Sequence, residues 1–319
     1  MAPPAPDRTI TLSGPLVPSL PTERRSFAPA YVALVLGAVA MGVSPVFVRW
    51  VSPEVGPFAS AFWRVALALP LLYGWMRAEE AGGHRAHSAA TWPTLIAGAA
   101  FAGDLFFWHL AILGTTVANA TFFATTAPVF VVLATWLVWA RRPRLATIAG
   151  LALCLLGGSA LLGESLQVAP GRILGDLYGL ATAVFFGLYF LAIERARAHA
   201  SAARVTFVSS LVTAAILLLV ALVFDAARFW PTTLPGSAAL LGLAWLSHAG
   251  GQGLLAVALG RLPAVFSSLV IFLEALVAAA AGSLLLGEGV SFVQAAGGAL
   301  ILLGIWIARP RRPRAEVHS

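Results

Sequence analysis

The amino-acid sequence predicts an all-α integral membrane protein of ten transmembrane helices, arranged as two five-helix repeats of inverted topology. Three observations predict this fold class: the composition, the number of long apolar segments, and a phrase that occurs twice. Hydrophobic residues make up 60% of the 319 residues and charged residues 10%, with a mean hydropathy of +0.89. A soluble domain usually carries about 25% charged residues, so a water-soluble core could not hide this much apolar surface. We therefore expect the chain to lie in a lipid bilayer.

Ten segments are apolar enough to cross a bilayer as helices. A membrane helix needs roughly 20 predominantly apolar residues to cover the ~30 Å hydrocarbon core. The predicted spans are residues 30–49, 57–76, 93–113, 117–139, 145–162, 173–193, 205–224, 237–259, 263–286 and 291–308. The fifth and tenth spans are short, and the sixth follows a polar start, "GRILGDLYG". Because the number of spans is even, the two ends of the chain are expected on the same side.

The arginines predict which side that is. All 20 basic residues are arginine, and 16 of them lie in the two tails and in the loops that follow even-numbered spans. The opposite side has three, namely Arg49, Arg172 and Arg228, and Arg64 lies within the second span. Positive charge is retained on the cytoplasmic side of a membrane. Both termini are therefore expected in the cytoplasm of a bacterium, with the protein in the inner membrane.

The tails and the net charge carry little further information. Residues 1–29 are rich in proline and serine and lack the apolar core of a signal peptide, which predicts a disordered cytoplasmic tail. Residues 309–319 form a basic cytoplasmic tail. The formal charge of +7 lies mainly between apolar runs, so it does not predict a nucleic-acid partner. The lone Cys154 permits no intramolecular disulfide.

A repeated phrase divides the spans into two halves. "AGLALCLLG" at residues 149–157 returns as "AGGALILLG" at 296–304, with seven of nine positions identical. Any two Gly/Ala/Leu helices can match by chance, but the register of 146 or 147 residues continues upstream over about thirty residues and pairs Pro128 with Ala275. The repeats are residues 30–162 and 173–308. Because five spans is an odd number, the second repeat enters the membrane upside down, an arrangement common in transporters with a midplane substrate site.

Three stretches carry a resemblance to a known family. They are "FASAFWRVALALPLL" in the second span, "AILGTTVANATFFATTAPVF" from the third span into the fourth, and "GEGVSFVQAAGGALILLG" at the end. With these the chain resembles the EamA-type, ten-helix members of the drug/metabolite transporter superfamily, and more narrowly the YddG-type bacterial exporters of aromatic amino acids. The resemblance implies a central cavity enclosed by spans one, three, four, six, eight and nine. The family often has Glu-Pro in span nine, where this chain has Glu274-Ala275, so a proline kink is not expected there.

Three ionisable residues deep in the spans are the leading candidates for a substrate site. Asp104, His248 and Glu274 each lie eleven residues into a predicted span. A charge at the bilayer centre costs ~2.5–3.5 kcal/mol on insertion scales, so such residues usually face a cavity or a partner. Each also has a structural alternative, as a hydrogen-bonded group in the interior of the bundle. Trp108 and Gln252 share a helix face with Asp104 and His248 respectively, four residues further on.

Further residues complete the predicted site and its flexible points. Asn119 and Tyr189 are expected to contact the substrate, with Glu274 and His248 approaching from one half and Asp104, Trp108 and Asn119 from the other. Arg64 is expected to form an internal ion pair with Glu54. The repeated phrase itself is expected to serve packing, through the small-residue stripe Gly150, Cys154 and Gly158. The predicted hinge or kink positions are Pro45, Pro128, Gly187, Gly250 and Gly251.

The predicted function is secondary transport. The chain contains no P-loop, G-x-S-x-G or H-E-x-x-H motif, so the sequence predicts neither an ATP-driven pump nor an enzyme. No cofactor or metal is expected, and the histidines His84 and His87 in a loop do not predict a metal site. We expect export of amino acids and related metabolites, aromatic ones first, by alternating access. The alternatives are non-aromatic amino acids, polyamines or cationic drugs, and a lipid-modifying membrane enzyme. The expected partners are a small-molecule substrate and the lipid bilayer, and the oligomeric state is not predicted.

Overall fold

The structure, a computed structural model, describes residues 27–82, 91–162, 170–286 and 291–310, and within these ranges every regular element is helical. Spans one to five consist of α1 (Ala28–Gly42) with α2 (Ser44–Val51); α3 (Pro57–Ala66) with α4 (Leu69–Ala81); α5 (Trp92–Gly114); α6 (Val117–Thr125) with α7 (Ala127–Trp139); and α8 (Leu145–Leu162). Spans six to ten consist of α9 (Ile173–Arg197); α10 (Ala202–Phe224); α11 (Leu234–Gly242) with the π-helix η4 (Leu243–Gln252) and α12 (Gly253–Leu259); α13 (Ala264–Val270) with α14 (Phe272–Leu286); and α15 (Phe292–Ala308). Helix α1 begins at Ala28, two residues before the predicted start of the first span. Residues 1–26 of the N-terminal tail and residues 311–319 lie outside the described residues.

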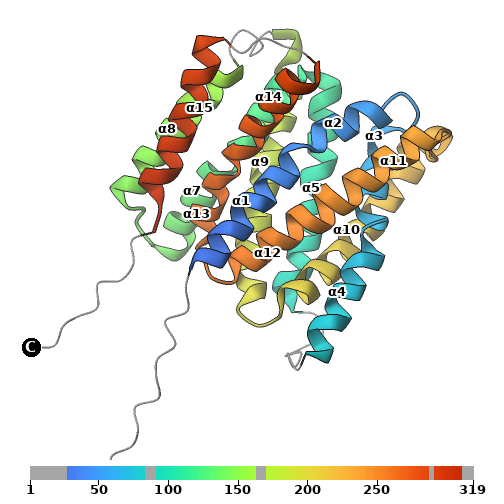
Figure 1. Cartoon of the computed structure of the whole chain (residues 1–319), viewed down its shortest axis with the longest axis horizontal. Helices are drawn as coiled ribbons and strands as arrows, with labels where there is room; N and C mark the ends of the chain where they lie inside the picture. Colours follow the sequence, from blue (N-terminus) through green and yellow to red (C-terminus); the bar gives the residue numbers. More distant parts are fainter. Residues whose placement is uncertain (1–26, 83–90, 163–169, 287–290, 311–319) are drawn as a thin grey trace, which may run out of the picture.

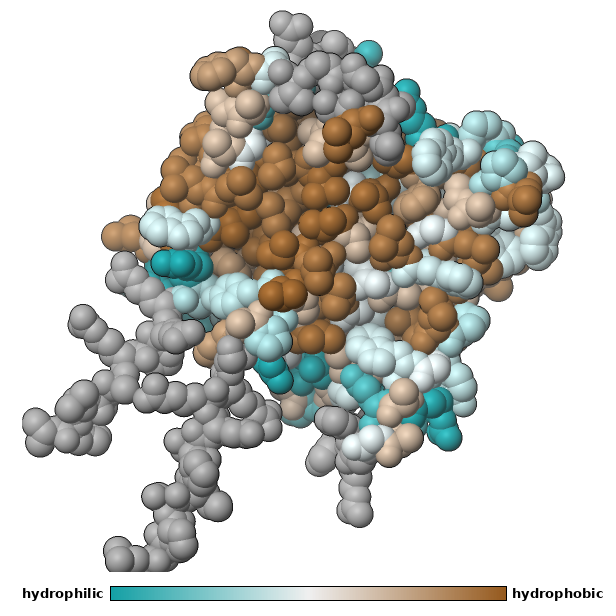
Figure 2. All heavy atoms as spheres, in the orientation of Figure 1, coloured by the Kyte–Doolittle hydropathy of each residue, from teal (hydrophilic) through white to brown (hydrophobic). Residues whose placement is uncertain are grey.

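The ten predicted spans are confirmed. In the described part of the chain, nine helical segments are long and apolar enough to cross a membrane, and the tenth, α15, is an apolar helix of 17 residues. Figure 2 shows hydrophobic residues over the middle of one face, with hydrophilic residues gathered along its lower edge and again at the upper right. A surface of this kind suits lipid in the middle and water at both ends. The chain is therefore a multi-pass membrane protein.

Four of the spans are interrupted. The first span breaks at Val43, just before Pro45, and the fourth breaks at Thr126, just before Pro128. Proline cannot donate a helical hydrogen bond, so a break in the preceding turn is expected at both places. The ninth span also breaks, at Ile271, although Ala275 stands where the family often has proline. The second span breaks at Leu67 and Ala68, before Pro70.

The two repeated phrases pack directly against each other. They lie in α8 and α15, which run side by side at one edge of the bundle (Figure 1). A Cβ added at Gly150 would lie 2.5 Å from the carbonyl oxygen of Gly304, and one added at Gly157 would lie 2.5 Å from that of Gly297. Small residues thus let the two backbones approach closely, as predicted for Gly150 and Cys154. Gly158, the third residue of the predicted stripe, faces Phe272 and Phe122 instead. The duplication placed matching small residues on both surfaces of one interface.

These contacts also establish the inverted relation of the repeats. The repeat offset pairs Gly150 with Gly297 and Gly157 with Gly304. Exchanging the repeats therefore converts the contact between Gly150 and Gly304 into the contact between Gly297 and Gly157, and both are present. A two-fold axis across antiparallel helices produces this exchange, whereas a parallel repeat does not. The neighbouring spans follow the same rule, since α5 packs on α9 in the way that α12 and η4 pack on α1.

Carboxylates cap the N-termini of the second and seventh spans from the other repeat. Asp225 accepts hydrogen bonds from the backbone N–H groups of Phe58 (2.6 Å) and Ala59 (2.9 Å), at the start of α3. Glu79 accepts one from the N–H of Ala203 (3.3 Å), at the start of α10. Asp225 follows Glu79 by the repeat offset of 146 residues. The two caps, which satisfy N–H groups that a helix leaves unpaired, are thus equivalent contacts at opposite ends of the bundle.

We call the two ends of the bundle the arginine-rich end and the opposite end. The arginine-rich end is defined by Arg141, Arg142, Arg144, Arg195, Arg197, Arg204, Arg261 and Arg309, and it is where α1 begins and α15 ends (Figure 1). The opposite end carries Arg49, Arg172 and Arg228. Among these, Arg228 donates to the carbonyl oxygen of Ser52 and so joins the loops that follow α2 and α10.

Candidate functional site

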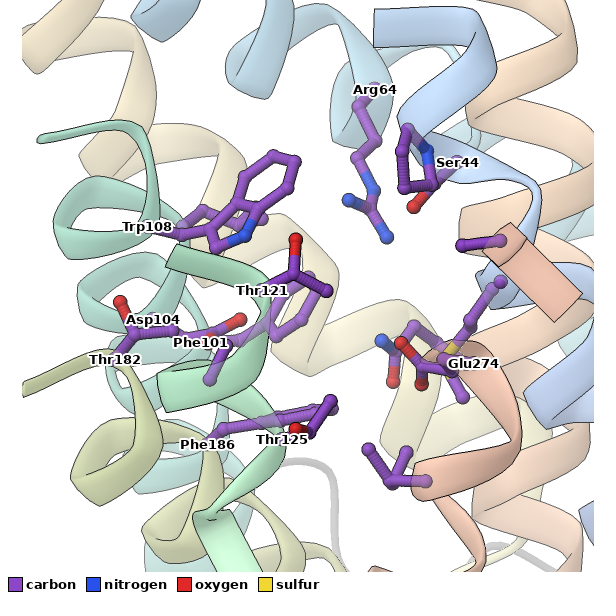
Figure 3. Close-up of a pocket in the computed structure, with 18 residues that line it drawn as sticks. Ser44, Arg64, Phe101, Asp104, Trp108, Thr121, Thr125, Thr182, Phe186 and Glu274 are labelled. Atoms are coloured by element: carbon purple, nitrogen blue, oxygen red, sulfur yellow. The ribbon is translucent and has the colours of Figure 1, made fainter. Parts of the chain in front are cut away.

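A cavity lies between the two repeats, beside the interrupted spans. Its walls come from α1, α2, α3, α5, α6, α9, η4 and α14 (Figure 3). The space open to the centres of water molecules is about 80 Å³, enough for several waters or a small part of a solute. The lining residues are Met41, Gly42, Ser44, Pro45, Arg64, Phe101, Asp104, Leu105, Trp108, Thr121, Ala124, Thr125, Thr182, Phe186, Gln252, Ile271, Glu274 and Ala278.

Three charged groups face this cavity. Arg64 on α3 extends into it, with Asp104 on α5 to one side and Glu274 on α14 to the other (Figure 3). Both Arg64 and Asp104 are 7% exposed. The guanidinium lies near enough to both carboxyl groups to interact electrostatically, although no ion pair within 4.0 Å joins them in the described part of the chain. Buried opposite charges that are not in contact leave room for a group between them.

Two acceptor atoms at the cavity have no partner in the described structure. They are Oε1 of Glu274 and Oε1 of Gln252, and Gln252 is only 1% exposed. Nε of Arg64 likewise has no hydrogen-bond partner among the described residues. A buried polar group that stays unpaired costs about 1–3 kcal/mol, so these atoms are suited to meeting water or a solute.

Helix breaks place these polar groups. Ser44 and Pro45 begin α2 just after the break in the first span, and the carbonyl oxygen of Glu274 comes close to Gly42, where an added Cβ would lie 3.0 Å from it. Glu274 is the third residue of α14, directly after the break at Ile271. The breaks in the two repeats therefore lie side by side and bring backbone ends and side chains to one depth of the bundle. Irregular backbone at membrane depth is tolerated where it lines a cavity.

The rest of the lining is aromatic and hydroxylated. Phe101 and Trp108 lie on α5, and Phe186 lies on α9 on the same side of the cavity, across from Glu274 (Figure 3). Hydroxyl groups come from Thr121 and Thr125, four residues apart on α6, together with Ser44 and Thr182. The Thr125 hydroxyl donates to the carbonyl oxygen of Phe122 at 2.8 Å, which leaves its lone pairs to accept. Sequence reasoning selected Trp108 among these residues but none of the hydroxyl-bearing ones, although the four-residue spacing of Thr121 and Thr125 ahead of Pro128 was visible.

His248 and Tyr189 lie behind the cavity wall. Neither residue lines the space, and both contact the ring of Phe101, which does line it, with ring centroids 5.4 Å from His248 and 5.0 Å from Tyr189. Nε2 of His248 is 2.9 Å from the hydroxyl of Ser210, and Nδ1 has no partner among the described residues. Both residues therefore support the lining ring and do not touch the space directly.

Asn119 also lies away from the cavity. Its side-chain amide donates to Asp176 at 2.9 Å, and the Thr115 hydroxyl donates to the same oxygen at 2.7 Å. Asp176 stands in the first turn of α9, so this buried cluster joins the start of the second repeat to the turn between spans three and four. Of the seven predicted substrate-contacting residues, the structure gathers Asp104, Trp108, Gln252 and Glu274 around one cavity.

The predicted ion pair between Arg64 and Glu54 is wrong. Glu54 lies in an exposed loop, where its carboxylate accepts from the backbone N–H groups of Thr232 and Thr233, both at 2.9 Å, and from the two threonine hydroxyls. The Thr233 hydroxyl above all lowers the pKa of Glu54 below the usual 4.5. The acidic groups that interact with Arg64 are instead the buried Asp104 and the partly buried Glu274.

The predicted hinge positions fall in different local structures. Pro45 and Pro128 stand in the first turns after two helix breaks. Gly250 and Gly251 lie in η4, and an added Cβ at Gly251 would come within 2.5 Å of the Met41 side chain in α1. Gly187 lies within the uninterrupted helix α9 and faces α7. The prolines thus mark helix breaks, and Gly187 and Gly251 lie at close contacts between helices.

The described residues contain no group of three His, Cys, Asp or Glu side chains that could hold a metal ion. His84 and His87, considered from the sequence, lie outside the described residues. Gly287 and Glu288, which contribute to the family resemblance, also lie outside them.

Comparison with known proteins agrees with this architecture. A family model described as "EamA-like transporter family" matches the chain twice, over residues 28–162 and 173–309. A search of curated protein sequences finds no match. A solved structure titled "Crystal structure of protein" is similar in fold, with a TM-score of 0.75 and 20% sequence identity over 89% of this chain and 97% of that one.

Proposed function

The chain belongs to the EamA-like transporter family, and from this premise we propose that it is a secondary transporter of amino acids, aromatic ones first. It exports them from the bacterial cytoplasm across the inner membrane, with both of its termini on the cytoplasmic side. Transport proceeds by alternating access, in which the repeats rock about the cavity between them. The 16 arginines on one side and three on the other support this orientation.

The observation that carries the substrate class is the arrangement of Arg64, Asp104 and Glu274. An amino acid brings an ammonium group and a carboxylate that need opposite partners. Arg64 suits the carboxylate, because its planar guanidinium can donate two parallel hydrogen bonds. Asp104 and Glu274 suit the ammonium group. The histidine and asparagine donors expected from the sequence lie outside the cavity, so Arg64 takes their role in this proposal.

The aromatic rings support a preference among amino acids. Phe101, Trp108 and Phe186 stand on the walls beside the charged groups. Aromatic pairs contribute about 0.5–1.5 kcal/mol beyond the burial of their area, so an aromatic side chain gains more from these walls than an aliphatic one. Outward movement of a repeat is needed to admit the whole solute, since the cavity of about 80 Å³ holds only a part of it.

A second candidate substrate class is favoured by the count of charges. Two carboxyl groups face the cavity and one guanidinium does. That balance also suits a cationic solute such as a polyamine or a cationic drug, for which Arg64 would be repulsive. The two classes differ in whether Arg64 assists transport or opposes it.

Flux measurements in proteoliposomes test the proposal. Labelled phenylalanine, tryptophan, leucine and spermidine are compared in vesicles with matched amounts of wild type and Glu274→Gln. We expect faster flux of the aromatic amino acids and a loss of at least tenfold in Glu274→Gln, because glutamine keeps the shape and removes the charge. Glu54→Gln is the matched control, since it removes a carboxylate from the exposed loop outside the cavity. Full amino-acid flux in Glu274→Gln, or flux of spermidine alone, would contradict the proposal.

A further inference from the structure

A second cavity opens at the arginine-rich end, away from the site between the repeats. Its volume is about 310 Å³, and it lies where α7, α8, α13 and α15 meet. The lining residues are Val132, Thr135, Arg141, Arg142, Pro143, Arg144, Thr147, Pro263, Val265, Phe266, Ala308 and Pro310. We call it the arginine groove. Its walls come from both repeats, because α7 and α8 belong to the first and α13 and α15 to the second.

The arginine groove combines positive charge with an apolar floor. Arg141, Arg142 and Arg144 are exposed, and within the described residues none of their side chains has a hydrogen-bond or ion-pair partner. Beneath them, Phe266 is 5% exposed and packs in the core of the bundle. Among the described residues, the three guanidinium groups around this hollow therefore meet no acidic side chain. Such a hollow is complementary to an anion that also carries apolar groups.

Aromatic residues place the arginine groove at the depth of lipid headgroups. Trp139, at the end of α7, lies under the guanidinium of Arg195, 4.4 Å from the ring centroid. Trp306, near the end of α15, holds that of Arg309 in the same way at 4.9 Å. Tryptophan collects at membrane–water interfaces, where its ring meets the headgroup region. The groove lies beside these two helix ends and hence in the interfacial layer.

The surface that leads away from the groove is apolar. Leu137 and Val138 on α7 and Leu145 on α8 flank the loop of the three arginines, and they are 73%, 68% and 85% exposed. These side chains belong to spans that the bilayer surrounds, so acyl chains can lie against them. A ligand with a phosphate at the arginines and hydrocarbon chains along α7 and α8 would match both surfaces.

We propose that the arginine groove binds the phosphate headgroup of an anionic phospholipid, with the acyl chains running along α7 and α8. The bound lipid joins the two repeats at the arginine-rich end and so stabilises the arrangement of the bundle described here. Arginine is suited to phosphate because its fork of donors matches two phosphate oxygens. Each arginine near an anionic lipid surface contributes about 1 kcal/mol, which corresponds to about fivefold in affinity. This inference does not depend on the identity of the transported solute.

Binding is measured on the purified full chain by native mass spectrometry and by melting temperature. Phosphatidylglycerol is compared with phosphatidylcholine of the same acyl chains, and with sn-glycerol 3-phosphate, which has the phosphate without chains. Wild type is compared with Arg141→Gln/Arg144→Gln and with the control Arg49→Gln/Arg77→Gln, which removes two charges outside the groove. We expect wild type to prefer phosphatidylglycerol and to melt higher with it. The groove variant should lose about tenfold or more of that preference, while the control keeps it.

A third variant separates the groove from charge alone. Val265→Trp fills the hollow and leaves all three arginines in place, so it should also weaken binding of phosphatidylglycerol. Equal binding of the two lipids to wild type, or an unchanged preference in both groove variants, would overturn the proposal. Competition by sn-glycerol 3-phosphate as strong as that of the lipid would also overturn it, since a free phosphorylated solute would then be the occupant. A transport defect without a change in lipid preference concerns the proposed function and leaves this inference standing.

Discussion

At the scale of single residues, the chemistry of this protein depends on where Arg64 points. Its guanidinium enters the cavity from α3, between carboxyl groups that come from different repeats. A buried arginine without an ion-pair contact is costly, because its hydration is lost without full replacement. The carboxylate of a bound solute would replace the hydration that the guanidinium has lost. Arg64 is therefore the residue at which an amino-acid substrate and a purely cationic substrate can be told apart.

We predict that two single variants differ in how they affect substrate selectivity. Arg64→Gln should lower flux of tryptophan more than flux of tryptamine, which has the same ring and amine without the carboxylate. Glu274→Gln should lower flux of both. A hydrogen bond to a charged group contributes about 1.5–3 kcal/mol, so we expect the tryptophan-to-tryptamine ratio to change by roughly 10-fold to 100-fold in Arg64→Gln. The measurement is initial flux in proteoliposomes with matched protein. An unchanged tryptophan-to-tryptamine flux ratio would show that Arg64 does not bind the carboxylate of tryptophan.

At the scale of helices, close packing and capping hold the two repeats together. Gly157 and Gly297 let α8 and α15 approach to backbone contact, and Asp225 and Glu79 tie the second and seventh spans together at the two ends. The π-helix η4 adds an irregular element that carries Gln252 into the cavity. Wide helical turns of this kind are rare and often occur at functional sites. Irregular elements thus bring Ser44, Gln252 and Glu274 to the solute space. The uninterrupted helices α5 and α9 complete its wall, and α8, α10 and α15 supply the frame.

We predict that the contact between α8 and α15 tolerates no methyl group. Gly157→Ala places a Cβ 2.5 Å from the carbonyl oxygen of Gly297 and 2.9 Å from Ile301, so the helices must separate. Overpacking typically costs 1–3 kcal/mol, and the melting temperature in detergent should fall. Gly74→Ala is the control, because a Cβ there meets nothing within 4 Å, and alanine favours a helix interior by roughly 0.5–1 kcal/mol. Equal melting temperatures for the two variants would contradict this account of the interface.

We predict that the two caps restrain opposite ends of the cavity. Asp225→Ala removes the acceptor at the start of α3, and Glu79→Ala removes the one at the start of α10. Loss of such a cap costs about 0.5–2 kcal/mol, enough to shift an equilibrium between two arrangements several-fold. A cysteine at Thr121 reports access when vesicles are treated with an impermeant thiol reagent from either side. Labelling should rise from the opposite end in Asp225→Ala and from the arginine-rich end in Glu79→Ala.

The parent chain is the control for this experiment. Cys154 is fully buried between α8 and α15, so the chain without the added cysteine should not react. Labelling that rises from the same side in both variants would show that the caps do not act as equivalent restraints.

At the scale of the whole molecule, the inverted repeats determine where the site lies. The fourth and ninth spans correspond to each other in the two repeats, and both are broken. The cavity lies between these two breaks. The side chains around it are not equivalent, since Glu274 corresponds to Ala127 under the repeat offset. The fold is therefore symmetric while the site is not. The ionisable groups at the cavity come from both repeats, Arg64 and Asp104 from the first and Glu274 from the second.

The orientation of the whole bundle gives a further prediction. The arginine-rich end should face the cytoplasm, because positively charged segments resist translocation. A reporter that is active only in the periplasm should be silent when fused after Ser319 and active when placed between residues 225 and 236, in the loop at the opposite end. Expression of each fusion is checked by immunoblot. Activity of the Ser319 fusion would reverse the assigned orientation.

The sequence by itself determined the membrane class, the ten spans and their duplication. Each of these follows from a regular pattern along the chain, because a span must be apolar over its whole length and a repeat keeps its register. The breaks before Pro45 and Pro128 were visible for the same reason, since proline acts on its own helix. Among the site residues, Asp104 and Glu274 stood out because a charge inside a span is costly wherever it points.

Tertiary structure alone decided which of these residues meet. A span does not reveal which of its faces looks toward a cavity, so His248 and Asn119 could not be separated from Gln252 by sequence. Packing placed His248 against the ring of Phe101 and outside the cavity lining, and it paired Asn119 with Asp176, 57 residues away. No proline in the sequence predicts the break at Ile271. Arg64 interacts with the carboxyl groups of Asp104 and Glu274, 40 and 210 residues away, and not with the expected Glu54. Contacts between distant residues depend on how whole helices pack, and no local pattern records that.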